Sequence, residues 1–378
     1  MATRVDWDVV IVGAGPAGAA AALAARRAKA AARVLLVDRC DFPRDKPCGD
    51  GVAPHAFDLL EHLGVSGAAA GHDPVARLNV ATTGGTAVER TMARPAHVIP
   101  RAVFDARLVD AAVAAGAKRR VQTVRGISRT ADAVQVAGVG SARVVIGADG
   151  ANGVVRRLLG LPGHRRMAVA IRGYVPGVDE GEPTQRIWLD VDGRPPGYAW
   201  SFPLADGTGR TNVGYGVVLD GSGSVRRDDL VGRMHALVPA ARKASALRAH
   251  HLPLVAGRSV LGRDRVLLAG DAAGLVNPLT GEGIWYALLS GMLAGRAAVA
   301  HAHPLRRYRR DLRRALGSHH ASVRVLAPLV TSPLVVAGGL RAAHRHQAVF
   351  DDLVELGLAD GRLTPRLLAG TARYALAG

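Results

Sequence analysis

The stretch DVVIVGAGPAG at residues 8–18 decides the fold of this chain. The run over 8–12 is mostly apolar and β-branched, which predicts a short buried strand, and the glycines at 13–18 predict a turn. A helix is expected over 19–28, followed by a second apolar strand over 34–37 that ends at Asp38. Strand, turn, helix and strand in this order predict one βαβ unit.

The three glycines and the terminal acid of this unit indicate dinucleotide binding. Gly13 allows a tight turn, Gly15 lets the backbone approach a pyrophosphate, and Gly18 lets the helix pack closely on the strand. The N-terminus of the helix then faces the diphosphate, and Asp38 faces the ribose hydroxyls. We place three neighbours in the same predicted cofactor site: Pro16, Ala17 and Arg39.

Two later strands that end in an acid indicate that the dinucleotide is FAD. The sequence VIGADG at 145–150 predicts a buried strand entering a turn at Asp149, and VLLAGDAAG at 266–274 predicts another that ends at Gly270 and Asp271. Asp271 can accept a hydrogen bond from a ribityl hydroxyl. A helix is then expected to present its first N–H groups to the N1–C2=O edge of the flavin, opened by Pro278, Gly281, Gly283 and Ile284. One acid–glycine pair is commonly a plain turn. Three segments with such pairs in this order, at 145–150, 266–274 and 278–284, point to FAD.

The pattern along the chain predicts two interleaved domains. We expect an α/β Rossmann-like FAD-binding domain and a mainly antiparallel β domain for the substrate, because short strands with Gly-rich turns dominate residues 165–255. No internal repeat or low-complexity linker separates them. The predicted FAD-binding domain comprises 1–75, 96–164 and 256–300, the substrate domain 76–95 and 165–255, and the helical C-terminal region 301–378.

Charge and composition limit the classes of partner. The formal net charge is +18, carried almost entirely by Arg, with Lys only at 29, 46, 118 and 243. This bias fits the codon usage of a GC-rich genome, and it also fits attraction to an anionic membrane or an acidic cofactor. We expect no nucleic-acid partner, since no recognition motif is present and aromatic residues make up 4%.

Cysteine usage and the apolar segments suggest a cytoplasmic protein. Cys40 and Cys48 are too few for a disulfide framework and wrongly spaced for a closed metal site, so we predict neither and expect a reducing compartment. The late apolar stretch 325–340 contains Pro328, Pro333 and two glycines, which argues against a spanning helix. Peripheral contact with a membrane is left open.

Two further segments extend the resemblance of this chain to known flavoproteins. The motifs above, over about residues 5 to 300, resemble the group of aromatic hydroxylases, flavin-dependent halogenases and geranylgeranyl reductases. FPRDKPCGDG at 42–51 is similar to the geranylgeranyl reductase loop of basic residues, Cys and glycines that passes over the cofactor. PPGYAWSFP at 195–203 matches that family's PxxYxWxFP substrate motif at every fixed position, whereas halogenases carry WxWxIP. The resemblance implies FAD contacts from Arg44, Gly49, Asp50, Gly51 and Arg101.

Several of these residues keep a second interpretation. On a strand, Tyr198, Trp200 and Phe202 project to one face, which suits an apolar substrate but is also typical of a β-sheet core. Arg44 and Arg101 contact the FAD pyrophosphate or flavin, or are solvated surface arginines. Cys48 is either a small apolar residue under the ring or a thiol that donates a proton.

The expected reaction is reduction of an isolated C=C bond in an apolar isoprenoid or polyprenyl substrate. The family resemblance implies hydride from reduced FAD, a proton from an acid such as Cys48 or from water, and an alkene positioned by Tyr198 and Trp200. The electron donor is expected to be NAD(P)H, ferredoxin or another partner protein. The alternatives are an FAD-dependent monooxygenase, oxidase or halogenase acting on a secondary metabolite, and a flavin-bearing protein without catalysis.

Overall fold

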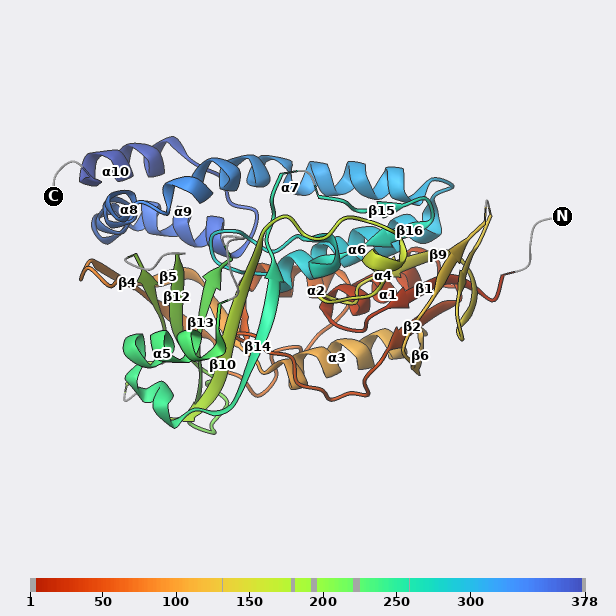
Figure 1. The fold of residues 1–378 in the computed structure, drawn as a ribbon, viewed down its shortest axis with the longest axis horizontal. Coiled ribbons are helices and arrows are strands. Elements are labelled where there is room, and N and C mark those ends of the chain that lie inside the picture. The colour runs from red at the N-terminus through yellow and green to blue at the C-terminus, as the bar shows by residue number, and fades with distance from the viewer. Residues whose placement is uncertain are drawn as a thin grey trace.

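The computed structural model describes residues 5–130, 132–177, 181–191, 196–219, 225–257 and 259–375. Within them the chain forms two sheets that lie side by side, with the C-terminal helices along one edge of the molecule (Figure 1). Pro195, the first residue of the predicted substrate motif, lies outside the described residues.

The first sheet is built on the predicted βαβ unit. Its parallel strands run in the order β16, β9, β1, β2, β6, and shorter antiparallel strands extend it. Residues 9–12 of β1 and the first four residues of β2 are buried, as expected for parallel strands covered on both faces. The strands are β1 Trp7–Val12, β2 Val34–Asp38, β6 Lys118–Val121, β7 Ile127–Arg129, β8 Val134–Val136, β9 Gly140–Gly147, β15 Gly262–Arg263 and β16 Val266–Leu268.

Two helices pack tightly against each other beside this sheet. Helix α1 (Pro16–Ala28) begins three residues earlier than predicted, because the fixed φ of Pro16 suits a first helical turn that needs no N–H there. It packs on α6 (Ile284–Ala300) through small residues. A Cβ on Gly291 or Gly295 of α6 would come within 2.1 Å of the Ala17 or Ala21 carbonyl oxygen of α1. The remaining helices of this part are α2 Pro54–His62, α3 Arg101–Ala114, α4 Val155–Leu158 and the 3₁₀ turn η2 Gly270–Ala273.

The second sheet carries the predicted substrate motif. Its order is β14, β10, β13, β12, β11, β4, β5, β3, and every pairing is antiparallel except that of β4 with β11. Strand β5 continues beyond residue 95 to Val98, and β3 also joins this sheet. The strands are β3 Gly51–Val52, β4 Val75–Thr82, β5 Ala87–Val98, β10 Met167–Pro176, β11 Thr184–Asp190, β12 Gly197–Pro203, β13 Arg210–Val218 and β14 Ser245–Pro253.

Helices cover both faces of this second sheet. Helix α5 (Arg227–Leu237) packs on one face, followed by the 3₁₀ turn η1 (Pro239–Lys243). The sequence did not predict α5, because only Leu230 and Met234 of this helix are buried and the apolar periodicity is weak. The C-terminal helices pack on the other face, at β4 and β5. They are α7 Pro304–Leu329, α8 Pro333–Arg345, α9 Gln347–Leu358 and α10 Pro365–Ala375.

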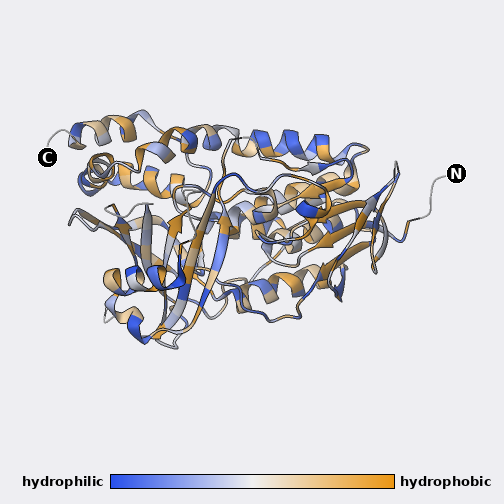
Figure 2. Ribbon diagram, viewed as in Figure 1, coloured by the Kyte–Doolittle hydropathy of each residue, from blue (hydrophilic) through white to orange (hydrophobic). Residues whose placement is uncertain are grey.

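The expected fold class is confirmed. An α/β cofactor fold alternates along the chain with a mainly antiparallel β region, and helices follow. Figure 2 shows the strands of the first sheet largely in the hydrophobic colour, which agrees with their burial. None of the helices in the described ranges is long and apolar enough to cross a bilayer.

Candidate functional site

Two glycines, Gly13 in the turn after β1 and Gly18 in α1, are required by close backbone contacts within the protein. Gly13 has a φ of +100°, and a Cβ there would lie 2.3 Å from the Ala148 carbonyl oxygen. A Cβ on Gly18 would lie 1.8 Å from the Gly13 carbonyl oxygen. These two positions therefore hold α1 against the strands, as the sequence predicted for Gly18.

Gly15 is different, because the atoms nearest to it belong to charged side chains and not to the backbone. The three atoms nearest to a Cβ there would be Arg44 Nη2 at 3.5 Å, Arg101 Nη2 at 3.8 Å and Asp105 Oδ2 at 3.9 Å, all at ordinary van der Waals distance. Arg101 donates to both oxygens of the fully buried Asp105, at 2.7 and 2.8 Å, and Arg44 lies 3.3 Å from the same carboxylate. Burial opposes the charge of Arg101, but Asp105 raises its pKa above the usual value.

This arrangement fits an anion. Two guanidinium groups share one carboxylate, so one positive charge stays uncompensated beside the N-terminus of α1. That N-terminus has no side-chain cap and no acidic residue in its first turn, and its N–H groups and dipole favour a negative ligand. The residues present fit the diphosphate of a dinucleotide.

The two acids expected at the nucleotide end lie at the turns. Asp38 accepts hydrogen bonds from the Ala14 N–H at 2.8 Å and the Cys40 N–H at 2.9 Å. Asp149 accepts one from the Val155 N–H at 2.9 Å through Oδ2, while its buried Oδ1 has no hydrogen-bond partner among the described residues. Burial raises the pKa of Asp149. An unpartnered buried acceptor is costly, and a ligand hydroxyl would satisfy it.

Asp271 lies in η2, the 3₁₀ turn that follows β16, and is paired with a lysine that the sequence reasoning did not single out. Lys46 Nζ lies 3.0 Å from Asp271 Oδ2. Burial opposes the ionisation of Asp271, but Lys46 and His250 lower its pKa overall. His250 lines the same cavity, and burial together with Lys46 lowers its pKa to about 4. The pattern of the sequence gave no signal for His250, which lies on β14.

One cavity of about 1320 Å³ brings most of the predicted residues together. It runs between the two sheets and continues under the C-terminal helices. Three predicted residues do not line it: Gly18, Asp50 and Gly270. The predicted residues that do line it are Gly13, Gly15, Pro16, Ala17, Asp38, Arg39, Arg44, Cys48, Gly49, Gly51, Arg101, Asp149, Tyr198, Trp200, Phe202, Asp271, Pro278, Gly281, Gly283 and Ile284.

The three aromatic residues of β12 share one face, as expected. The ring centroids of Tyr198 and Trp200 lie 5.8 Å apart, and those of Trp200 and Phe202 lie 6.5 Å apart. Trp200 is 4% exposed and lies over β13, where a Cβ on Gly214 would come within 2.2 Å of its ring. The Tyr198 hydroxyl donates to the Thr280 carbonyl, which ties β12 to the turn that opens α6.

Asp50 points away from the cavity into a buried polar network. It accepts hydrogen bonds from the Tyr174 hydroxyl and, at 2.8 Å, from Asn212 Nδ2. Asn212 also donates to the Cys48 carbonyl at 2.8 Å and accepts from Trp200 Nε1 at 2.9 Å. Burial raises the pKa of Asp50 to about 6. The network joins the loop of Cys48 to the aromatic face, and Asn212 is a residue that the sequence reasoning missed.

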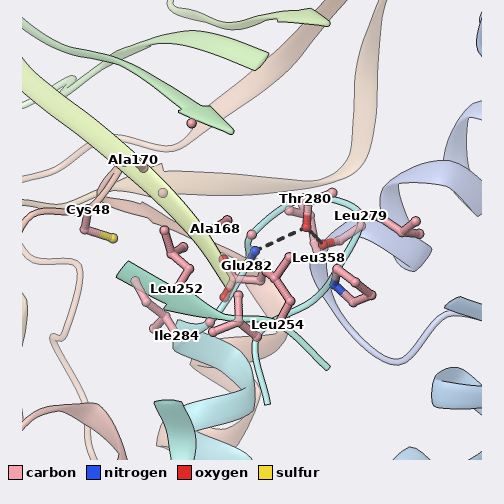
Figure 3. Close-up of a pocket in the computed structure, with 18 of the residues that line it drawn as sticks. Cys48, Ala168, Ala170, Leu252, Leu254, Leu279, Thr280, Glu282, Ile284 and Leu358 are labelled. Carbon is pink, nitrogen blue, oxygen red and sulfur yellow. Dashed lines mark hydrogen bonds between the residues drawn. The ribbon is translucent and has the colours of Figure 1, made fainter. Parts of the chain in front are cut away.

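Two groups that can carry a proton face the apolar part of the cavity (Figure 3). Burial raises the pKa of the Cys48 thiol, so it stays protonated at neutral pH. Burial also raises the pKa of Glu282 to about 7, although its Oε1 accepts a hydrogen bond from the Trp285 N–H at 2.8 Å. In sequence, Glu282 was only a member of the turn before α6. Its neighbours in the cavity come from a distant segment, Leu252 from β14 and Leu254 from just after that strand.

Comparisons with known proteins agree with this site. Residues 6–190 match the family model described as FAD binding domain. The chain is 36% identical over 324 residues to a menaquinone reductase of Mycolicibacterium smegmatis, covering 76% of this chain and 75% of that protein. It is 34% identical to digeranylgeranylglycerophospholipid reductase 2 of Methanopyrus kandleri, covering 78% and 77%.

The fold also matches a solved structure. A geranylgeranyl bacteriochlorophyll reductase-like protein of Thermoplasma acidophilum superposes with a TM-score of 0.74 at 20% identity, over 97% of this chain and 96% of that one. The cofactor is FAD, and the protein is an FAD-dependent oxidoreductase. On its sequence relatives, its motifs and its fold, the chain belongs to the geranylgeranyl reductase family of FAD-dependent oxidoreductases.

Proposed function

We propose that this enzyme reduces isolated C=C bonds of an isoprenoid or polyprenyl substrate. The observation that carries the proposal is the cavity, in which the aromatic face of β12 and an apolar extension under the C-terminal helices adjoin the dinucleotide site. A long hydrocarbon chain needs such a lining, whereas a small polar metabolite does not. The named substrates of two relatives, menaquinone and digeranylgeranylglycerophospholipid, both carry polyprenyl chains.

The cofactor-binding roles belong to the same proposal. Arg44, Arg101 and the α1 N-terminus hold the diphosphate at Gly15, and Asp38 and Asp149 hold the nucleotide end. At the flavin end, Asp271 and the first N–H groups of α6 support the ribityl chain and the ring edge. When bound in its reduced form, FAD supplies the hydride for one alkene carbon.

The chain's own residues orient the alkene, exclude water and provide the proton. Tyr198 and Trp200 hold the alkene, because their rings are fixed by bonds to Thr280 and Asn212. Cys48 Sγ–H donates its proton to the second alkene carbon, which completes the addition of two hydrogens. Solvent then returns a proton to the thiolate. In the alternative, Cys48 is a small residue that only lets the loop pass close to the ring. Loss of its thiol proton would then leave alkene reduction unchanged.

Electron supply and substrate supply complete the proposal. NAD(P)H and a ferredoxin-type protein are the two candidate electron donors, and rapid mixing of oxidised enzyme with each one distinguishes them. An apolar substrate is delivered most directly from a lipid phase, so the proposal includes peripheral contact with a membrane.

The decisive experiment is anaerobic. Dithionite-reduced protein is incubated with short and long prenyl compounds, and the masses of the products are measured by mass spectrometry. We expect a gain of two hydrogens and reoxidised flavin. A product that appears only with oxygen and contains an added oxygen or halogen atom contradicts the proposal.

A further inference from the structure

The cavity continues far beyond the dinucleotide site into an apolar compartment. Leu78 and Met92 of the second sheet line it on one side, and Leu340, Phe350 and Leu367 of the C-terminal helices line it on the other. These five side chains are buried in one hydrophobic cluster. A compartment of this composition accepts hydrocarbon, and its outer end shows where that hydrocarbon enters.

The cavity reaches the surface at the C-terminal helices. Leu329, Val330 and Leu368 line the cavity and are 42%, 39% and 47% exposed. Side chains that border both the cavity and the solvent mark an opening, which we call the mouth. The mouth lies between the end of α7 and α10, on the edge of the molecule that Figure 1 shows in blue.

Apolar side chains gather next to the mouth. Of the seven large apolar side chains that are exposed in the described part of the chain, five lie on the segment from α7 to α10. Four of them, Val325, Leu329, Val330 and Leu334, follow one another around the end of α7 and the start of α8, and we call them the apolar patch. Val325 and Leu329 are one helical turn apart and therefore share a side of α7. Clustered exposed apolar residues mark an interaction surface.

The same helix carries positive charge. The solvent side of α7 exposes Arg306, Arg310, Arg313 and Arg324, and Figure 2 shows hydrophilic residues along the outer side of the first half of the helix. The one carboxylate of α7, Asp311, is paired with Arg307 at 2.6 Å. An arginine-rich helix that ends in exposed apolar residues is complementary to an anionic bilayer, with its charges at the headgroups and its apolar end in the acyl layer.

We propose that α7 and the apolar patch dock on an anionic lipid bilayer, and that the prenyl chain passes from the bilayer through the mouth into the cavity. The prenyl chain then moves from one apolar environment to another without crossing water. Exposure of the prenyl chain to water would otherwise cost free energy at every turnover. The role of the mouth rests on the proposed reduction of a prenyl substrate, whereas docking on the bilayer does not.

Binding is tested on the full-length, FAD-loaded protein with vesicles of phosphatidylcholine, with or without phosphatidylglycerol. Val325→Gln/Leu334→Gln changes two patch residues that are 54% and 53% exposed and do not line the cavity, and it should weaken binding to the anionic vesicles about tenfold. The matched control is Val113→Gln/Val121→Gln, two similarly exposed side chains, 45% and 50%, away from the mouth. Equal loss in both variants, or none in the patch variant, overturns the proposal. The proposal is also overturned if the parent is a dimer and the patch variant is a monomer, because a second copy of the protein would then cover the patch.

The charge contribution is tested separately, with exposed residues whose replacement leaves the fold intact. Arg310→Gln/Arg313→Gln should weaken binding about tenfold at low salt and have little effect at high salt. Arg242→Gln/Lys243→Gln on η1 removes the same charge beyond α5, on the other side of the molecule, and should change little. Equal effects of the two pairs would show attraction by net charge alone and would contradict docking through α7.

Turnover distinguishes a failure of the mouth from a failure of the proposed function. The Val325→Gln/Leu334→Gln variant, whose two positions lie outside the cavity lining, should reduce a short, water-dispersed prenyl alcohol at the parental rate, but a long polyprenyl substrate embedded in anionic vesicles about tenfold more slowly. Equal rates on the embedded substrate overturn entry through the mouth. If the parent reduces neither substrate, the proposed function fails, and the vesicle binding alone still decides whether α7 docks.

Discussion

Replacing Gly15 by Ala should separate cofactor binding from folding. The backbone of Gly15 has a φ of −71°, which Ala adopts without strain, and the nearest atom to a new Cβ is 3.5 Å away. Ala restricts the unfolded chain and thereby stabilises the protein by about 0.4–1 kcal/mol. Ala is also a poorer N-cap than Gly, which costs a similar few tenths to about 1 kcal/mol. The two effects offset each other, so we expect the free energy of unfolding of the apoprotein to change by less than about 1 kcal/mol.

The same methyl group should strongly weaken FAD binding. It occupies the space between the α1 N-terminus and the guanidinium groups of Arg44 and Arg101, where we place the diphosphate. Displacing the phosphate there loses one or two charge-assisted hydrogen bonds, each contributing about 1.5–3 kcal/mol. The Kd for FAD should therefore rise by about tenfold to about twenty-thousand-fold, and Gly15→Val should leave the purified protein largely without flavin.

Fluorescence titration of the apoprotein with FAD and urea unfolding of the same sample measure the two quantities. Gly13→Ala and Gly18→Ala are the contrasting variants, because a Cβ there would lie 2.3 and 1.8 Å from backbone atoms and should destabilise the fold itself. A Gly15→Ala protein that binds FAD like the parent would refute the placement of the diphosphate. Unfolding comparable to that of Gly13→Ala would refute the reasoning that this glycine serves the ligand alone.

Three further predictions concern the chemistry of the cavity. Trp200→Ala should lower the free energy of unfolding by about 3 kcal/mol and abolish most prenyl turnover, with FAD retained. Trp188→Ala, on the neighbouring strand and outside the cavity lining, should lower the free energy of unfolding alone. Unfolding and steady-state assays measure the two effects. Cys48→Ser should slow reoxidation of reduced flavin by an alkene in stopped-flow traces and leave reduction by the electron donor unchanged. Glu282→Gln should gain stability relative to the parent as pH rises from 5 to 8, by up to about 3 kcal/mol in urea unfolding of the apoprotein.

The sign for Glu282 follows from proton binding. Its pKa is raised from 4.5 to about 7 in the folded protein, so the folded state holds a proton that the unfolded state has released between these values. Stability of the parent therefore falls as pH rises through this window, and Gln removes that dependence. A difference in the free energy of unfolding between the variant and the parent that is equal at pH 5 and pH 8 contradicts a buried, protonated Glu282.

The other two predictions have equally clear contrary outcomes. Unaltered alkene reduction in Cys48→Ser leaves that residue a packing role, and a cofactor-free, aggregated Trp200→Ala protein assigns the aromatic face to the core.

Local patterns in the sequence were enough to predict the fold class and the cofactor. The βαβ unit could be read because a buried strand, a Gly-rich turn and a helix are each encoded within a few neighbouring residues. The single face of Tyr198, Trp200 and Phe202 follows from the two-residue period of a strand, and the structure confirms it. Helix α5 was missed since its burial rests on two side chains, too few to give a period.

The tertiary structure decided which residues meet across the cavity. Asn212 and Asp50 are far apart in sequence, yet they meet because β13 pairs with β12 beside the loop of Cys48. No local signal encodes such a contact, since it depends on the register of one strand against another. The raised pKa of Glu282 has the same origin. Its cause is the removal of water by distant segments, and burial exists only once those segments have packed together.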